Sequence, residues 1–234
     1  MSVATAAGTF GVGVVFGLAL AAPPGPMNAV IAEESALRGW LAGFTAGLGA
    51  MTADLVFFGL SLAGVVAFLE GAELVRAAMV GVGGLVMLYF AVGALSEARA
   101  GFRSEDADPD GDDADARGFT KAFVLALTNP YQILFWLTVG VGLLEPGTVD
   151  VLSSLPLVGE GLAGVLVVRT GSPALLVGLF GGIVVWITGF PATLVSVGRR
   201  VDAFAPAVAA ASALVLAGFG VTFCWTATKA LVGL

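Results

Sequence analysis

The sequence predicts an all-α integral membrane protein with six transmembrane helices, arranged as two inverted three-helix repeats. The composition is 58% hydrophobic and only 12% charged, whereas soluble domains carry about 25% charged residues. Several stretches provide the roughly 20 apolar residues that a helix needs to cross a bilayer. Two proline breaks, Pro23-Pro24-Gly25-Pro26 and Asn129-Pro130, interrupt such stretches at corresponding places in the two halves of the chain.

Six apolar stretches define the predicted spans and the domains. A linker at residues 97–118 separates a first repeat, residues 1–96, from a second repeat, residues 119–234. Because three spans per half is an odd number, the second half is expected to be inverted relative to the first, as in many secondary transporters. The helices that form spans one and four are the two that proline breaks. The spans are predicted at residues 8–37, 39–69, 74–96, 119–144, 174–197 and 207–231.

The distribution of Lys and Arg predicts the orientation. Positive residues favour the cytoplasmic side of short loops. With the amino terminus outside, three of them fall on the outer side and seven on the inner side, namely Arg38, Arg99, Arg103, Arg117, Lys121, Arg199 and Arg200. We therefore expect a multi-pass protein of the cell membrane with both termini outside and the linker in the cytoplasm.

The charge balance excludes several classes of protein. A formal net charge of −7 argues against nucleic-acid binding, which needs a basic face. An acidic, Lys-poor composition is also typical of halophiles, because a high-salt cytoplasm screens surface repulsion. The chain has no histidine and a single cysteine, Cys224, so a two-thiol redox relay is excluded. We expect no cofactor, no resident metal and no enzymatic activity.

The two breaks are the predicted substrate site. Proline lacks an amide N–H and collides with the carbonyl one turn earlier, so neither segment can be a continuous helix. Pro26 and Pro130 suit the first position of the half-helix that follows each break. Each such start points unpaired N–H groups and a partial positive charge toward mid-membrane. Such ends suit an anionic group, for example the carboxylate of an amino acid. The alternative is a simple proline kink. The predicted substrate-binding residues are Pro24, Gly25, Pro26, Asn28, Asn129 and Pro130.

Asp54 is the predicted proton-coupling residue. It lies midway along the second span, with no basic residue near it in sequence. An ionised carboxylate there costs about 2.5–3.5 kcal/mol even on the lenient insertion scale. Taking up a proton relieves that cost, which is the property that proton coupling requires. The alternative is a structural Asp that bonds to a neighbouring helix.

Other polar and aromatic residues have less specific interpretations. Glu33, Glu34 and Arg38 end the first span, where they form either a solvated face with a Glu34–Arg38 pair or an inner gate. Trp136 lies inside the fourth span and either packs or lines the cavity. Gly39, Gly43 and Gly47 recur every four residues in span two, a spacing that favours close helix packing in lipid.

Two predicted loops have two interpretations each. Residues 105–115 are rich in Asp, and the run Asp106–Gly111 matches the opening of a calcium-binding loop, but Arg117 stands where the bidentate Glu is required. A solvated acidic linker is therefore expected there, with loose cation binding as the alternative. Residues 145–173 are too interrupted to span a membrane and fit either a lid or an interfacial segment.

These segments together resemble the lysine exporter (LysE) family of translocators. The resemblance rests on Pro-Pro-Gly-Pro-Met-Asn at residues 23–28, Arg38-Gly39, Asp54, and Thr-Asn-Pro-Tyr-Gln at residues 128–132. It implies a proton-motive-force-linked exporter of amino acids or other small metabolites. Ala53 and Tyr131 depart from the Gly and Lys that the family often has at these places, and the change at Tyr131 leaves the substrate open.

The leading hypothesis is therefore an alternating-access secondary exporter, with protons and a small molecule such as an amino acid as partners and a homo-oligomer possible. The alternative is a divalent metal-ion exporter in which Asp54, Asn28 and Asn129 provide oxygen ligands.

Overall fold

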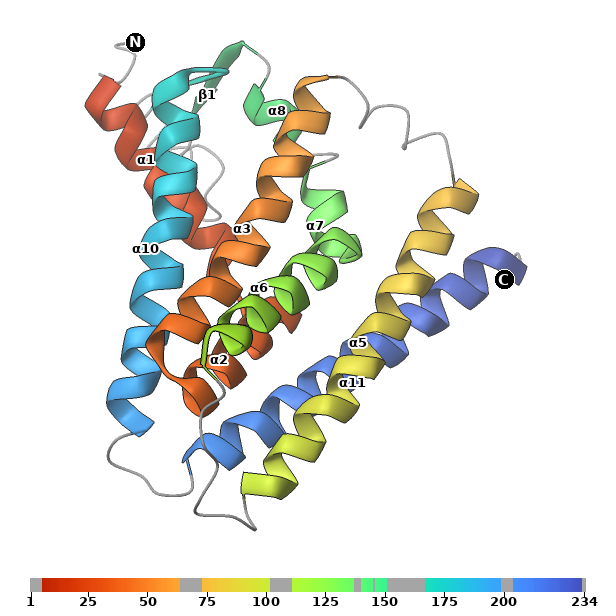
Figure 1. Cartoon of the computed structure of the whole chain (residues 1–234). Coiled ribbons are helices and arrows are strands. Elements are labelled where there is room, and N and C mark those ends of the chain that lie inside the picture. The colour runs from red at the N-terminus through yellow and green to blue at the C-terminus, as the bar shows by residue number, and fades with distance from the viewer. Residues whose placement is uncertain are drawn as a thin grey trace, which may run out of the picture. The chain divides into compact units, whose positions relative to one another are not determined.

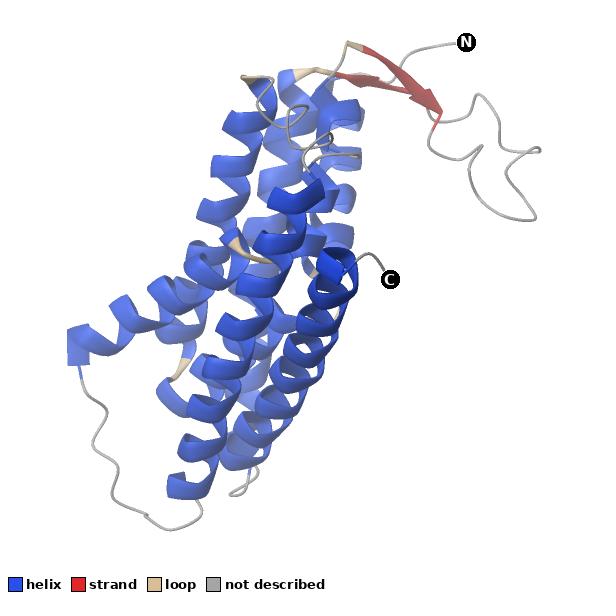
Figure 2. Ribbon diagram, turned by 90° about the vertical axis from the view of Figure 1, so that its right-hand side faces the viewer, coloured by secondary structure: helices blue, strands red, loops and turns tan. Residues whose placement is uncertain are grey.

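The computed structural model describes residues 6–63, 73–101, 111–136, 140–144, 146–150, 167–198 and 204–232. Helices dominate these residues, with a single short hairpin among them (Figure 2), so the predicted helical class is confirmed. By packing, the chain divides into two compact units. The first unit is residues 1–22 with 138–186, and the second is residues 23–137 with 187–234. The boundaries of the two repeats at residues 1–96 and 119–234 remain a prediction.

The first unit contains a hairpin within the predicted loop 145–173. Gly147 pairs with Thr170 and Asp150 with Val167 in an antiparallel ladder. Gly171 follows the hairpin with φ of 67°, a left-handed conformation that glycine adopts at no steric cost. The elements of this unit are α1 (Ala6–Ala21), α8 (Val141–Leu144), β1 (Gly147–Asp150), β2 (Val167–Thr170) and the first part of α10 (Pro173–Gly198).

Glycines bring α1 and α10 into backbone contact. A Cβ added at Gly13 would lie 2.9 Å from the Cα of Gly178, and one added at Gly17 would lie 3.0 Å from the Cα of Gly182. Both pairs are spaced four residues apart on their helices, so they form one flat strip on each. Small residues are the ones that let helix backbones approach closely in lipid.

The second unit holds the remaining helices. The longest two, α5 and α11, pack along one another (Figure 1). Helix α2 packs against α3, α6 and α11, and α3 also packs against α6. The elements are α2 (Pro26–Arg38), α3 (Trp40–Leu62), α5 (Glu73–Gly101), α6 (Gly111–Leu127), α7 (Pro130–Phe135), the end of α10, and α11 (Phe204–Val232).

Both predicted breaks are present. The chain leaves the helical conformation over residues 22–25 and resumes it at Pro26, the first residue of α2, with extended Gly25 as the N-cap. Helix α6 ends at Leu127, and α7 begins at Pro130. Proline suits the first helical position because its missing N–H would have no partner there. The predicted helix starts at Pro26 and Pro130 are therefore confirmed.

The candidate membrane spans are fewer than six. By length and composition, four of the described helices can cross a bilayer, namely α3, α5, α10 and α11, and the broken pair α1 and α2 makes up to five. The predicted fourth span at residues 119–144 is divided among α6, α7 and α8, because the break falls within it. Six spans thus remain a prediction, whereas a membrane protein with several apolar helices is what the fold shows.

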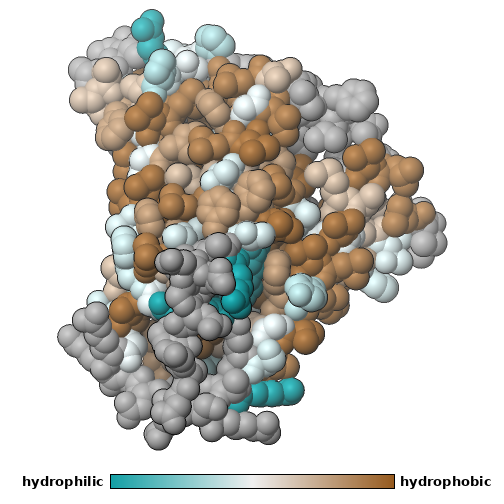
Figure 3. Space-filling model, in the orientation of Figure 1, coloured by the Kyte–Doolittle hydropathy of each residue, from teal (hydrophilic) through white to brown (hydrophobic). Residues whose placement is uncertain are grey.

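The surface fits an apolar environment. Hydrophobic side chains cover most of the face in Figure 3. In the described part of the chain, Leu74, Tyr89 and Leu214 are 71%, 75% and 76% exposed. Exposed apolar area on that scale is unfavourable in water and is typical of a surface that meets another apolar phase.

The glycines of α3 have two different roles. Gly43 and Gly47 face Ser35 and Ile187, so the prediction of close packing is confirmed for them. Gly39 has φ of 92°, and a Cβ added to it would meet nothing within 4 Å. The packing interpretation is therefore wrong for Gly39, which forms the joint between α2 and α3.

The calcium-loop-like run at residues 106–110 and the inner-side Arg103, Arg199 and Arg200 lie outside the described residues. Of the predicted linker at residues 97–118, residues 102–110 also lie outside them, whereas residues 97–101 belong to α5 and residues 111–118 belong to α6.

Gly49→Ala is expected to destabilise the second unit. A Cβ at Gly49 would collide with the backbone carbonyl of Phe119, so α3 and α6 would have to separate, at about 1–3 kcal/mol. Gly59→Ala on the same helix is the control, because a Cβ there meets nothing within 4 Å, and alanine favours the helix by up to about 1 kcal/mol. Thermal unfolding of the purified variants in detergent would compare the two. Equal melting temperatures would contradict the close approach at Gly49.

Candidate functional site

Asp54 lies in α3 and is only 6% exposed. Its Oδ1 accepts two hydrogen bonds, from Nε2 of Gln132 at 2.7 Å and from Nε1 of Trp136 at 2.8 Å. A buried carboxylate needs such donors, because burial removes the hydration that stabilises its charge. The side chain thus faces protein, although its role in proton coupling remains a proposal.

The two donors come from the helix that the second break starts. Gln132 lies in α7, and Trp136 follows its last residue. Because they are four residues apart, they share one face of that turn. The Trp136 ring also packs edge-on against Phe58, with ring centroids 5.9 Å apart. The helix that begins at Pro130 therefore directs two hydrogen-bond donors at Asp54.

At the first break, one of the predicted substrate-binding residues forms a hydrogen bond with the backbone of the break. Nδ2 of Asn28 donates a hydrogen bond to the carbonyl of Pro23 at 2.8 Å. Pro24 is exposed, Gly25 and Asn28 are half-buried, and Pro26 is buried. The Asn28 amide thus satisfies a carbonyl within the non-helical turn.

The second break is buried at its centre. Asn129 is 6% exposed. Its N–H donates to the carbonyl of Ala126, and its carbonyl accepts from the N–H groups of Gln132 and Ile133. Asn129 therefore ends one helix and begins the next. Pro130 is the first residue of α7.

The residues beside both breaks meet in one small cluster. Met27 directly follows Pro26, and Leu127 directly precedes the second break. Both pack against a buried core that includes Ala53, the neighbour of Asp54. The core consists of Ala50, Ala53 and Ala126, with Met27, Phe123 and Leu127 packed on it.

A second polar cluster connects α2 and α6. Nζ of Lys121 lies 2.6 Å from Oε1 of Glu33 and 3.8 Å from Oε1 of Glu34. Arg38 pairs with Glu34 at 2.8 Å within α2, as the i,i+4 spacing predicts. Lys121 also lies 5.6 Å from the ring centroid of Phe90 on α5, within cation–π range.

The prediction of a solvated face for Glu33 and Glu34 is wrong. They are only 0% and 3% exposed. The sequence placed Lys121 in the fourth span and gave it no partner. In the structure, α6 carries Lys121 against α2, and this contact shields the two carboxylates from solvent.

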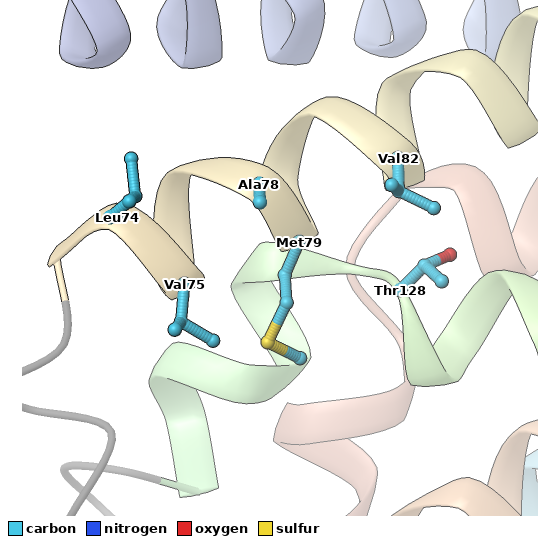
Figure 4. Close-up of a pocket in the computed structure, with 6 residues that line it drawn as sticks. All are labelled: Leu74, Val75, Ala78, Met79, Val82 and Thr128. Atoms are coloured by element: carbon cyan, nitrogen blue, oxygen red, sulfur yellow. The ribbon is translucent and has the colours of Figure 1, made fainter.

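An apolar cavity borders the second break. It has a volume of about 430 Å³ and is lined by Leu74, Val75, Ala78, Met79, Val82 and Thr128. Figure 4 shows Val75 and Met79 pointing from α5 toward the segment that carries Thr128. Asp54 and Asn129 do not line it, so it is separate from the polar site.

The described residues offer little for a metal. They hold no group of three or more His, Cys, Asp and Glu side chains placed to bind an ion. The polar site contributes a single carboxylate, Asp54, together with amide and indole groups.

Sequence reasoning missed two residues of these clusters, Gln132 and Lys121. The signal for Gln132 was present, because Asn129, Gln132 and Trp136 follow the i, i+3, i+7 pattern of one helical face. Nothing comparable marked Lys121, whose partner Glu33 is distant in sequence.

Trp136→Phe is expected to lower stability by about 1.5–3 kcal/mol, the range for a hydrogen bond to a charged group. The substitution keeps an aromatic ring against Phe58 and removes the donor to Asp54. Trp225→Phe is the control, because Trp225 is 65% exposed on α11. Unfolding in detergent, with Asp54→Ala in a double-mutant cycle, measures the coupling. Coupling near zero would show that the bond adds nothing.

Comparisons with known proteins agree with this architecture. The profile of the family described as LysE type translocator matches residues 18–227. A Pseudomonas aeruginosa protein named "Uncharacterized membrane protein PA4757" is 31% identical over 59% of this chain and 64% of its own. A Bacillus subtilis protein named "Putative amino acid efflux protein YcgF" is 34% identical over 53% of this chain and 58% of its own. The chain thus spans less than two thirds of either relative. No solved structure matches.

Because the family match covers most of the sequence, and the chain carries both helix breaks and several apolar helices, it belongs to the LysE-type translocators.

Proposed function

We propose that this translocator is a secondary active exporter of amino acids or similar small metabolites, driven by protons through alternating access. The observation that carries the proposal is the bonding of Asp54 to the helix that begins at the second break. The name of the Bacillus subtilis relative supports amino acids as the substrate class.

The bonds at Asp54 give proton binding a mechanical consequence. Hydrogen bonds to an ionised acceptor are roughly twice as strong as neutral ones. When Asp54 takes up a proton, both bonds from Gln132 and Trp136 weaken, and α7 is released from α3. Because α7 starts at Pro130, its release changes the geometry of the break. Proton binding and the substrate site are thereby coupled.

The breaks are the proposed substrate site. Pro24, Gly25, Pro26 and Asn28 form its part in the first half, and Asn129 with Pro130 forms its part in the second. Met27 and Leu127 support this arrangement, since they bring the residues beside both breaks to one cluster next to Asp54. An amino acid offers a carboxylate for amide donors and an ammonium group for carbonyl acceptors.

The wider architecture follows the same proposal. Two inverted repeats of three spans, with both termini outside the cell membrane, would let one half rock against the other around the site. Inward proton flow would then drive efflux.

The experiment is accumulation of labelled amino acids by inside-out vesicles, across the twenty proteinogenic amino acids, with and without a proton gradient. We expect gradient-dependent accumulation of at least one of them above vesicles that lack the protein. Parallel vesicles with radioactive Mn²⁺ test the alternative. Gradient-driven accumulation of Mn²⁺ with no amino acid accumulated would contradict the proposal.

Asp54→Asn is expected to reduce gradient-driven accumulation about tenfold or more, because an amide can still accept both bonds but cannot take up or release a proton. Exchange of labelled for unlabelled substrate, which needs no net proton movement, should continue. Asp150→Asn in β1 is the control carboxylate. If Asp54→Asn keeps full dependence on the gradient, Asp54 is a structural residue.

A further inference from the structure

The Glu33–Lys121 pair is a buried ionic contact that the proton and substrate chemistry does not use. Glu33 is 0% exposed and Lys121 is 13% exposed. Replacing a buried ion pair by packed hydrophobic residues is often neutral or stabilising. Stability alone therefore gives no reason to bury two charges between packed helices. Charged side chains are required, however, where the contact becomes exposed to water in another conformation of the protein.

The pair has a definite place relative to the breaks. On α2, Glu33 lies six residues after Met27, and on α6, Lys121 lies six residues before Leu127. Met27 and Leu127 pack on the same alanine cluster, just as Glu33 contacts Lys121. Helices α2 and α6 therefore run antiparallel. At about 1.5 Å per residue, the pair lies about 9 Å along both helices from the breaks.

We propose that Glu33 and Lys121 form the gate that closes the substrate site between α2 and α6, and that transport requires this pair to separate and hydrate. The proposal rests on the proposed function, because it assigns one boundary of the same site. In the closed state Lys121 is held by Glu33, by Glu34 at 3.8 Å and by the Phe90 ring. In the open state both charges face water in the path to the breaks.

Glu34 provides a matched control for Glu33. It is the next residue on α2 and is equally buried, at 3% exposure. Its short ion pair, however, goes to Arg38 on the same helix at 2.8 Å. Glu34→Gln removes that pair and the longer 3.8 Å contact to Lys121, but it leaves the 2.6 Å contact between Glu33 and Lys121 intact. Its effect on export is therefore expected to be smaller than that of a change at Glu33 or Lys121.

A paired apolar substitution separates a gate from a structural contact. Lys121→Met alone leaves Glu33 buried without its cation, and its melting temperature should fall. The double variant Glu33→Leu with Lys121→Met should recover the wild-type melting temperature, since it fills the same place with apolar groups. A gate that can no longer hydrate stays shut, so export by the double variant should fall about tenfold or more.

A thiol reporter follows the gate without reference to any substrate. Gly118 lies on α6, where an added Cβ would be 3.4 Å from Cδ of Glu34 on α2 and 3.4 Å from the carbonyl of Ala42 on α3, so a side chain there lies inside the contact. Gly118→Cys in a Cys224→Ala background can be labelled by a water-soluble methanethiosulfonate only when α2 and α6 part. We expect labelling of the apolar double variant to be about tenfold slower than that of the wild-type pair, with a smaller change for Glu34→Gln.

The export assay and the thiol labelling test different claims, namely the substrate class and the gate. If the apolar double variant exports at the wild-type rate, or if the thiol introduced by Gly118→Cys reacts as fast in it as beside the wild-type pair, the pair is not a gate. If no amino acid is exported by any protein in the vesicle assay while labelling still slows about tenfold, the gate stands and the assigned substrate class fails.

Discussion

Backbone hydrogen bonding inside an apolar phase is the constraint on which this structure depends. A carbonyl without a donor costs several kcal/mol in hydrocarbon, so irregular backbone persists there only where protein or a wet cavity serves it. The chain nevertheless breaks two apolar helices with proline. At the first break the Asn28 side chain serves the carbonyl of Pro23. At the second, Asn129 is bonded on both sides through its own backbone. At each break, an asparagine close to the proline thus provides hydrogen bonds within the protein.

The same constraint accounts for the polar interior of the second unit. Once Pro130 starts a new helix, the direction of α7 differs from that of α6, and two donors can reach a carboxylate on α3. Small residues make this possible, because Ala53 and Ala126 keep α3 and α6 close beside the site. A continuous fourth helix would carry Gln132 and Trp136 further along the axis of α6. The buried carboxylate and the broken helix thus depend on each other.

Much of this was predictable from the sequence, and the limits have physical causes. Local rules located the helix starts at Pro26 and Pro130 and the Glu34–Arg38 pair, because each depends on residues within one turn. The burial of Glu33 was not predictable, since it follows from Lys121 on a helix far along the chain. The role of Gly39 was also missed, because periodicity describes which residues share a face and carries no information on φ. The hairpin of β1 and β2 joins strands separated by a long segment, and hydropathy gave no sign of the pairing.

The contact between α1 and α10 in the first unit has a consequence for biosynthesis. Its two glycine strips lie near the beginning of the chain, at Gly13 and Gly17, and in its last third, at Gly178 and Gly182. Chains emerge from the ribosome amino terminus first, so α1 enters the bilayer long before its partner exists. Until then lipid tails must fill the shallow strip that α10 later occupies. The contact between α1 and α10 consequently cannot form before the chain has been synthesised as far as Gly182.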